Sequence, residues 1–79
     1  MSKILSVGGN GVINTDKILG MGEAKGNPIL RLIQSKEADG LVMDFRKGKA
    51  AKTIIYLEGG FIALSTTTIE TLQKRLLEL

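Results

Sequence analysis

The apolar residues of this chain fall into short runs separated by glycine-containing turns, and this pattern limits the possible folds more than any other feature. The runs are too short for buried helices and consist largely of β-branched or aliphatic residues, so they predict strands. In the first part of the chain these strands are predicted at residues 4–7, 12–13 and 17–21. The strongest turn signal, GGNG at 8–11, predicts a tight hairpin whose glycines adopt positive φ. It lacks the spacing and the lysine-hydroxyl ending of a phosphate-binding P-loop.

A first helix is predicted from Asn27 to Asp39. Asn27 has the residue type of an N-cap, and Pro28 suits the first helical position. Ile29, Leu32 and Ile33 fall on one face at helical spacing, Lys36 continues that stripe, and Gly40 is typical of a helix end. Arg31 lies on the other face, where it can point to solvent, to an acidic neighbour or to a ligand.

Further strands are predicted at 41–43, 54–57 and 61–65, with a turn at 58–60 between the last two. A second helix starts near Thr67 or Thr68, because Thr67 and Glu70 have the spacing of a capping box. Its apolar face consists of Ile69, Leu72 and Leu76, with Leu79 near it. Lys74 and Arg75 sit towards its C-terminus, where cations complement the helix dipole.

Three strands and a helix, followed by three strands and a helix, predict an α+β fold. Tight glycine turns suit hairpins better than crossover connections, so the small sheet is expected to be mostly antiparallel. The chain shows no linker or low-complexity segment, and we expect a single domain over residues 1–79.

Residues 46–52 (RKGKAAK) hold most of the positive character of the protein. The chain has eleven Lys and Arg against eight Asp and Glu, and without the four cations of this segment seven bases face eight acids. Strand-like runs flank the segment on both sides, so it is predicted to form a loop between two strands. Such a basic, glycine-containing loop can bind a polyanion. The alternative is a solvated hairpin tip that only keeps the protein soluble.

Composition narrows the possible functions. The chain has no cysteine and no histidine, so it lacks disulfides, thiolate metal sites and the commonest acid–base group near pH 7. Its acids are scattered, and the hydroxyls at 65–68 have no histidine to activate them. We therefore expect no catalytic residues, no metal, no cofactor and no small-molecule ligand.

A small domain without disulfides or metal sites often gains stability by oligomerising. The chain shows no bilayer-spanning run and no signal-peptide core, and we expect a cytoplasmic protein without a membrane partner.

The sequence resembles the RemA family of small bacterial regulators of extracellular-matrix genes. The resemblance runs without gaps from about Leu5 to Leu76. The segments that carry it are 7–13 (VGGNGVI), 16–18 (DKI, where the family typically has Asn-Arg-Ile), 27–34 (NPILRLIQ), 40–44 (GLVMD), Leu64-Ser65, Glu70-Thr71 and Arg75. No single segment is specific, and their order and spacing together make the match.

This resemblance implies a DNA-binding transcriptional regulator with a LytTR-like fold, assembled as a closed, octamer-like ring. It ties the position of Lys17, usually arginine in the family, to DNA binding. The family's Gly-Arg-Arg-Thr-Arg run falls on residues 48–52, where this chain has Lys49, Ala50 and Lys52 in place of three arginines. Lysine is a point charge, whereas arginine binds phosphate or guanine with two hydrogen bonds, so this loop is better suited to phosphate contact than to base reading.

The predicted function is therefore a ring-shaped homo-oligomer that displays basic loops to double-stranded DNA on its rim. The expected DNA-binding residues are Lys17, Arg31, Arg46, Lys47, Lys49 and Lys52. An RNA-binding ring is the first alternative, disfavoured by the scarcity of aromatic residues for base stacking. A structural oligomer without a nucleic-acid role is the second.

Overall fold

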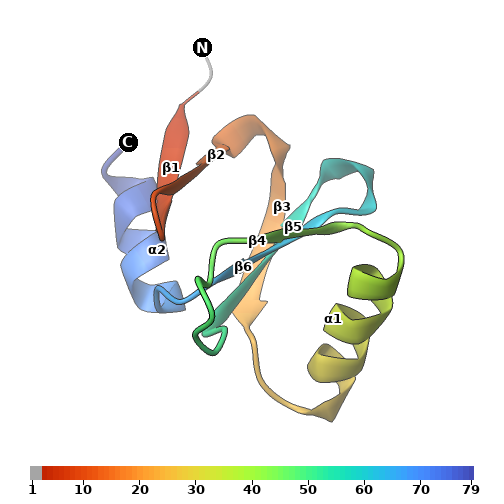
Figure 1. Ribbon diagram of the computed structural model, residues 1–79. Helices are drawn as coiled ribbons and strands as arrows, with labels where there is room; N and C mark the ends of the chain where they lie inside the picture. Colours follow the sequence, from red (N-terminus) through yellow and green to blue (C-terminus); the bar gives the residue numbers. More distant parts are fainter. Residues whose placement is uncertain (1–2) are drawn as a thin grey trace.

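The computed structural model of the protein describes residues 3–79, and it shows a small mixed sheet covered on both faces (Figure 1). The predicted domain also includes Met1 and Ser2, which lie outside the described residues. Four strands form the sheet in the order β3 (Ile18–Glu23), β5 (Thr53–Leu57), β6 (Ile62–Ser65) and β4 (Val42–Asp44). A separate antiparallel hairpin consists of β1 (Ile4–Gly8) and β2 (Gly11–Asn14). The predicted α+β class is confirmed.

The two helices lie on opposite faces of the four-stranded sheet. Helix α1 (Asn27–Ala38) covers one face, while α2 (Ile69–Leu77) and the β1–β2 hairpin cover the other (Figure 1). Side chains alternate between faces along a strand, so Ile54 packs towards α1 and Ile55 packs towards α2. Within residues 3–79, neither helix is long and apolar enough to cross a bilayer.

Two one-turn 3₁₀ elements connect strands, and one of them lies at 58–60, where a turn was predicted. A 3₁₀ turn, η1 (Thr15–Lys17), joins the hairpin to β3, and a second, η2 (Glu58–Gly60), joins β5 to β6. The GGNG hairpin turn is also confirmed, with φ of 84° at Gly8 and 57° at Gly9.

One strand pairing differs from the prediction. Strand β4 does not form a hairpin with β5 across the basic segment; it runs parallel to β6 at the edge of the sheet. The reason is the burial of β6, whose four residues are all buried and which therefore lies between two strands. The sheet is mixed as a result: β3–β5 and β5–β6 are antiparallel, and β4–β6 is parallel.

The capping residue of each helix lies one position from the predicted one. The N-cap of α1 is Gly26, with φ of 94°, and Asn27 is already helical and makes no side-chain cap. Pro28 lies in the first turn, at the second helical position and not at the first as predicted. At α2 the cap is Thr68, whose hydroxyl accepts from the Thr71 N–H. The predicted helix start near Thr67 or Thr68 is confirmed, whereas the capping box expected from Thr67 is wrong.

Candidate nucleic-acid interface

The basic segment arches across the carboxyl end of β6 and is fastened to that strand at both ends. The Phe45 N–H donates to the Leu64 carbonyl at 3.1 Å, and the Lys52 N–H donates to the Ser65 carbonyl at 2.8 Å. These carbonyls belong to consecutive residues, so the chain leaves the sheet on one side of β6 and returns on the other. We call residues 45–52 the basic loop.

The tip of the basic loop is a tight turn. The Lys49 N–H donates to the Arg46 carbonyl at 3.1 Å, and both residues between them have positive φ, 52° at Lys47 and 80° at Gly48. Positive φ at both central positions is the signature of a type I′ turn. Lys47 is not a glycine, so this conformation costs roughly 1 kcal/mol that the rest of the loop must offset.

An ion-pair cluster holds the root of the basic loop on the α1 side of the sheet. Arg46 donates from Nε to Asp44 Oδ1 and from Nη2 to Asp44 Oδ2, each at 2.9 Å. Its backbone N–H donates to the same Oδ1, also at 2.9 Å. Glu37 of α1 lies 3.5 Å from Arg46 Nη2, and the Arg46 side chain is only 26% exposed. These contacts balance the charge of Arg46 within the protein.

The pKa values of this pair move in the directions that the geometry requires. The hydrogen bonds from the Arg46 side chain lower the pKa of Asp44, and burial opposes this lowering. The pKa of Arg46 is raised, chiefly by the same bonds. Asp44 is therefore ionised throughout the neutral range.

Phe45 fastens the loop on the opposite side, under the GGNG turn. Its side chain packs against the core formed by the hairpin and α2. A β-carbon on Gly9 would lie 2.5 Å from the Phe45 carbonyl oxygen, and one on Gly11 would overlap the Phe45 ring. The glycine turn is thus a docking surface for the basic loop, a role beyond the positive φ that the sequence predicts.

Buried hydroxyls connect the same end of the hairpin to β6 and to the start of α2. The Ser65 hydroxyl donates to the Val7 carbonyl at 2.6 Å and accepts from the Thr67 N–H at 3.0 Å. The Thr53 hydroxyl donates to the Thr67 carbonyl at 2.7 Å. The basic loop, the GGNG turn and the start of α2 therefore converge on one end of the sheet.

Four of the six predicted DNA-binding residues lie on the basic loop, and three of these four are lysines. Lys47, Lys49 and Lys52 are exposed and make no ion pair with any residue from 3 to 79. Lys52 shares a shallow hollow with Lys25, but Glu23 and Glu70 also line it, so this hollow is not a purely cationic site.

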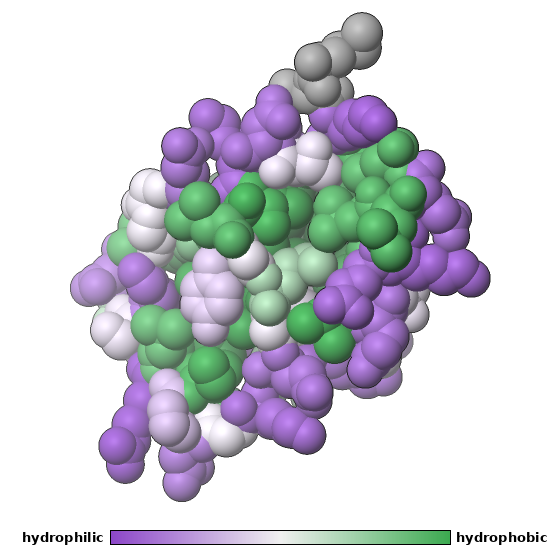
Figure 2. Space-filling view, turned by 180° about the vertical axis from the view of Figure 1, so that it is seen from behind, coloured by the Kyte–Doolittle hydropathy of each residue, from purple (hydrophilic) through white to green (hydrophobic). Residues whose placement is uncertain are grey.

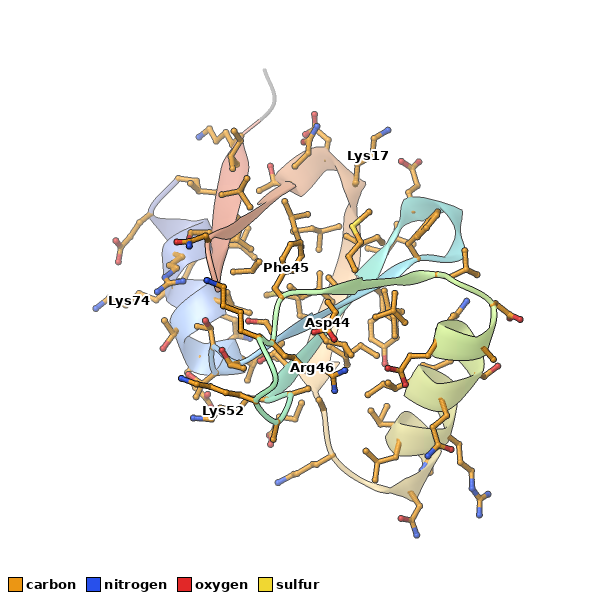
Figure 3. All side chains as sticks on the ribbon, viewed as in Figure 1. Lys17, Asp44, Phe45, Arg46, Lys52 and Lys74 are labelled. Atoms are coloured by element: carbon orange, nitrogen blue, oxygen red, sulfur yellow. The ribbon has the colours of Figure 1, made fainter. Side chains whose placement is uncertain are left out.

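The other three predicted residues have different surroundings. Arg46 lies at the root of the loop, paired as described above. Lys17 lies at the far end of the molecule from Lys52 and pairs with Glu58 at 3.2 Å (Figure 3). Arg31 is exposed on α1, away from that helix's buried face. The structure does not bring Lys17 or Arg31 together with the basic loop within one protomer.

Sequence reasoning missed two residues that build this site, Asp44 and Phe45. A signal for the first exists in the sequence, because an Asp two residues before a turn commonly accepts from the backbone N–H at that spacing. For Phe45, nothing local in the sequence indicates that it docks under distant glycines. Over the described part of the chain, no group of three or more acidic, histidine or cysteine side chains is placed to hold a metal ion.

Large apolar side chains are also exposed: Leu30 on α1 by itself, and the others in two separate groups. Leu19 (72% exposed), Val12, Met43 and Phe61 line two hollows that share Leu57 and Phe61. Ile4 and Leu77 (88% exposed), together with Leu79, belong to β1 and the C-terminal part of the chain at α2. Figure 2 shows several such apolar patches on the back of the molecule, interrupted by paler residues.

Comparison with known proteins gives a consistent match over nearly the whole chain. The family model RemA-like, described as extracellular matrix regulatory protein A-like, matches residues 4–76. A protein of Coprothermobacter proteolyticus is 35% identical over 98% of this chain and 73% of its own length. Another, of Lachnoclostridium phytofermentans, is 29% identical over 95% of this chain and 82% of its own length. Both carry names that begin "Putative regulatory protein".

Proposed function

Because this chain belongs to the RemA-like family, we propose that it is a DNA-binding transcriptional regulator and not an enzyme. In this proposal it acts in the cytoplasm as a ring-shaped homo-oligomer with a LytTR-like protomer and controls extracellular-matrix genes. The observation that carries the proposal is the basic loop, which is fastened at both ends and presents Lys47, Lys49 and Lys52 with no ion-pair partner among residues 3–79. The names of the relatives and of the family support a regulatory role.

The proposed mechanism is phosphate contact by repeated loops. Lysine binds phosphate as a point charge, so each loop holds the backbone of the duplex without reading bases. A single loop binds weakly, and several loops on one ring engage the same duplex with a high effective concentration. Sequence preference then comes from the shape and bendability of the DNA.

The exposed apolar residues support self-assembly. Leu19 lies on β3, an edge strand that carries only one charged residue and no proline. An exposed strand edge of this kind is a template for pairing with another chain. The two exposed groups consist of different residues, which favours a head-to-tail contact between copies, and such contacts form a ring when the rotation between copies closes.

A binding experiment with one pair of variants tests the proposal. Fluorescence anisotropy measures the affinity of the wild-type protein for duplex DNA, duplex RNA and single strands. We expect duplex DNA to bind best, and Lys49→Glu with Lys52→Glu to abolish that binding while the oligomer stays intact. The matched control reverses two exposed lysines outside the loop, Lys3→Glu with Lys74→Glu, and we expect it to retain most of the affinity.

The outcomes separate the alternatives. Preference for RNA would favour the RNA-binding ring. Wild-type affinity in the Lys49 and Lys52 variant would leave the basic loop as a solubility device. An absence of binding to any nucleic acid would favour a structural oligomer.

A further inference from the structure

We infer that Asp44 and Arg46 are positioning residues for DNA binding, so that the protein needs an acidic side chain in order to bind a polyanion well. This inference rests on the proposed function, since it concerns the same loop. In this inference Arg46 orders the loop and does not contact phosphate. Asp44 supports DNA binding, although its negative charge alone would be expected to weaken that binding.

A continuous path of hydrogen bonds leads from the sheet to the tip of the loop. Asp44 is the last residue of β4 and belongs to the pairing with β6. Its carboxylate accepts three hydrogen bonds from Arg46, each at 2.9 Å. The Arg46 carbonyl then accepts from the Lys49 N–H and closes the turn that contains Lys47. Each hydrogen bond in this path holds in place the residue that forms the next hydrogen bond.

The alternation of side chains along β4 explains why the loop is held from two sides. Asp44 points to the α1 side, where Glu37 adds a second carboxylate near Arg46, and Phe45 points to the hairpin side. Figure 3 shows Asp44 and Arg46 close together at the root of the loop, with Lys52 where the loop returns to the sheet. Removing the Asp44 contact leaves Phe45 and the two backbone bonds to β6, so we expect the fold to persist and the tip to lose its defined conformation.

Two models make opposite predictions for the loss of Asp44. If Arg46 binds phosphate directly, Asp44 competes with DNA for it, and removing Asp44 strengthens binding. If Asp44 positions the turn, its removal weakens binding despite the more positive charge, because DNA must then order the lysines itself. Ordering a flexible side chain costs enough to lower affinity about threefold to tenfold.

The experiment compares full-length Asp44→Ala and Asp44→Asn with wild type on a duplex of about three helical turns. The matched control is Glu70→Gln, which removes an acid that lines the same hollow as Lys52. We expect affinity to fall in Asp44→Ala by about threefold to tenfold and less in Asp44→Asn, whose side-chain oxygen still accepts from the Arg46 N–H. The control should bind as well as wild type or better. Amide hydrogen exchange of Lys49 should rise in Asp44→Ala before any DNA is added.

Arg46→Lys provides a second test if Asp44→Ala does not fold. Lysine keeps the charge but cannot make the paired bonds to both carboxylate oxygens. Direct phosphate contact predicts nearly unchanged affinity, whereas positioning predicts weaker binding with faster Lys49 exchange. Unchanged or stronger binding in the Asp44 variants, or weaker binding without faster exchange, would overturn the inference. If wild type binds no DNA, the proposed function fails, and the exchange data alone decide whether Asp44 orders the turn.

Discussion

The ring of Phe45 occupies the space in which a β-carbon on Gly11 would lie. This contact joins the start of the basic loop to the β1–β2 hairpin, two parts of the chain that are distant in sequence. It explains in physical terms why a glycine is needed at this position even though its φ is not in the left-handed region. The requirement is space, and a methyl group is enough to violate it.

We therefore expect Gly11→Ala to destabilise the protein by about 1–3 kcal/mol, the usual cost of an overpacked contact. Urea denaturation followed by circular dichroism measures the change. Gly20→Ala is the matched control, because a β-carbon there meets nothing within 4 Å and Gly20 does not have positive φ. Equal unfolding free energies for the two variants would show that Phe45 does not pack against Gly11 in solution.

The helix caps give a second comparison. Thr68→Ala should cost about 1 kcal/mol, because it removes the hydroxyl that accepts from the Thr71 N–H. Asn27→Ala should change stability by less than about 0.5 kcal/mol, since Asn27 is exposed and makes no cap. Thermal and urea midpoints measure both. A loss of stability in Asn27→Ala as large as that in Thr68→Ala would show that Asn27 is the N-cap, as the sequence predicts.

Much of the local structure follows from the sequence because its causes are local. Short apolar runs and glycine turns mark the strands of the hairpin and the sheet, and Ile29, Leu32 and Ile33 mark the face of α1 by their spacing. The position of β4 does not follow in this way, because it depends on the complete burial of β6, which no local pattern near residue 42 reveals. Asn27 has a favourable residue type for a cap, but the positive φ of Gly26 moves the boundary by one residue.

The candidate site was predictable in location and less so in detail. The charge of residues 46–52 identifies the loop, and three of its cations are indeed exposed. Charge counting cannot distinguish Arg46 from its neighbours, because the distinction arises from Asp44, two residues before it, and from Glu37, which the fold brings to it. The contact of Gly9 and Gly11 with Phe45 joins the hairpin to the loop, two segments that are distant in sequence. Sequence periodicity does not predict such a contact.

The lowered pKa of Asp44 predicts how the loop responds to acid. A carboxyl group with a lowered folded-state pKa stabilises the fold above its ordinary value of 3.8, and this contribution is lost as pH falls through the lower folded value. The charged groups facing Asp44 are Arg46, whose pKa is raised and which stays protonated, and Glu37 beyond it. We expect the side-chain carboxyl resonance of Asp44 to titrate with a midpoint below 3.8. A midpoint above that value would show that the ion pair is not formed in solution.

Self-assembly predicts a mass several times 8.5 kDa by light scattering after size exclusion. Leu19→Asp places a charge on the exposed apolar edge of β3, where it would be buried without a partner in an assembled protein, and should reduce that mass. Gln73→Asp, on an exposed position of α2, introduces the same charge and should not. A folded wild-type monomer at micromolar concentration would remove both the ring and the avidity argument.

The dependence of DNA binding on duplex length tests the mechanism itself. A short duplex reaches one or two loops of a ring, whereas a longer duplex reaches more, and each added contact is intramolecular at an effective concentration that can approach about 1 mM. If the three lysines of a loop neutralise about two phosphates, each added loop makes the slope of log affinity against log salt more negative by about 1.8. As duplexes lengthen from about one helical turn to several, we therefore expect affinity to rise more steeply than the number of binding registers, with a salt slope that steepens in parallel. The Lys49→Glu and Lys52→Glu variant, measured on the same duplexes, should lose both trends. A constant salt slope, with affinity proportional to the number of binding registers, would mean that a single loop binds the DNA and that ring assembly does not increase the affinity.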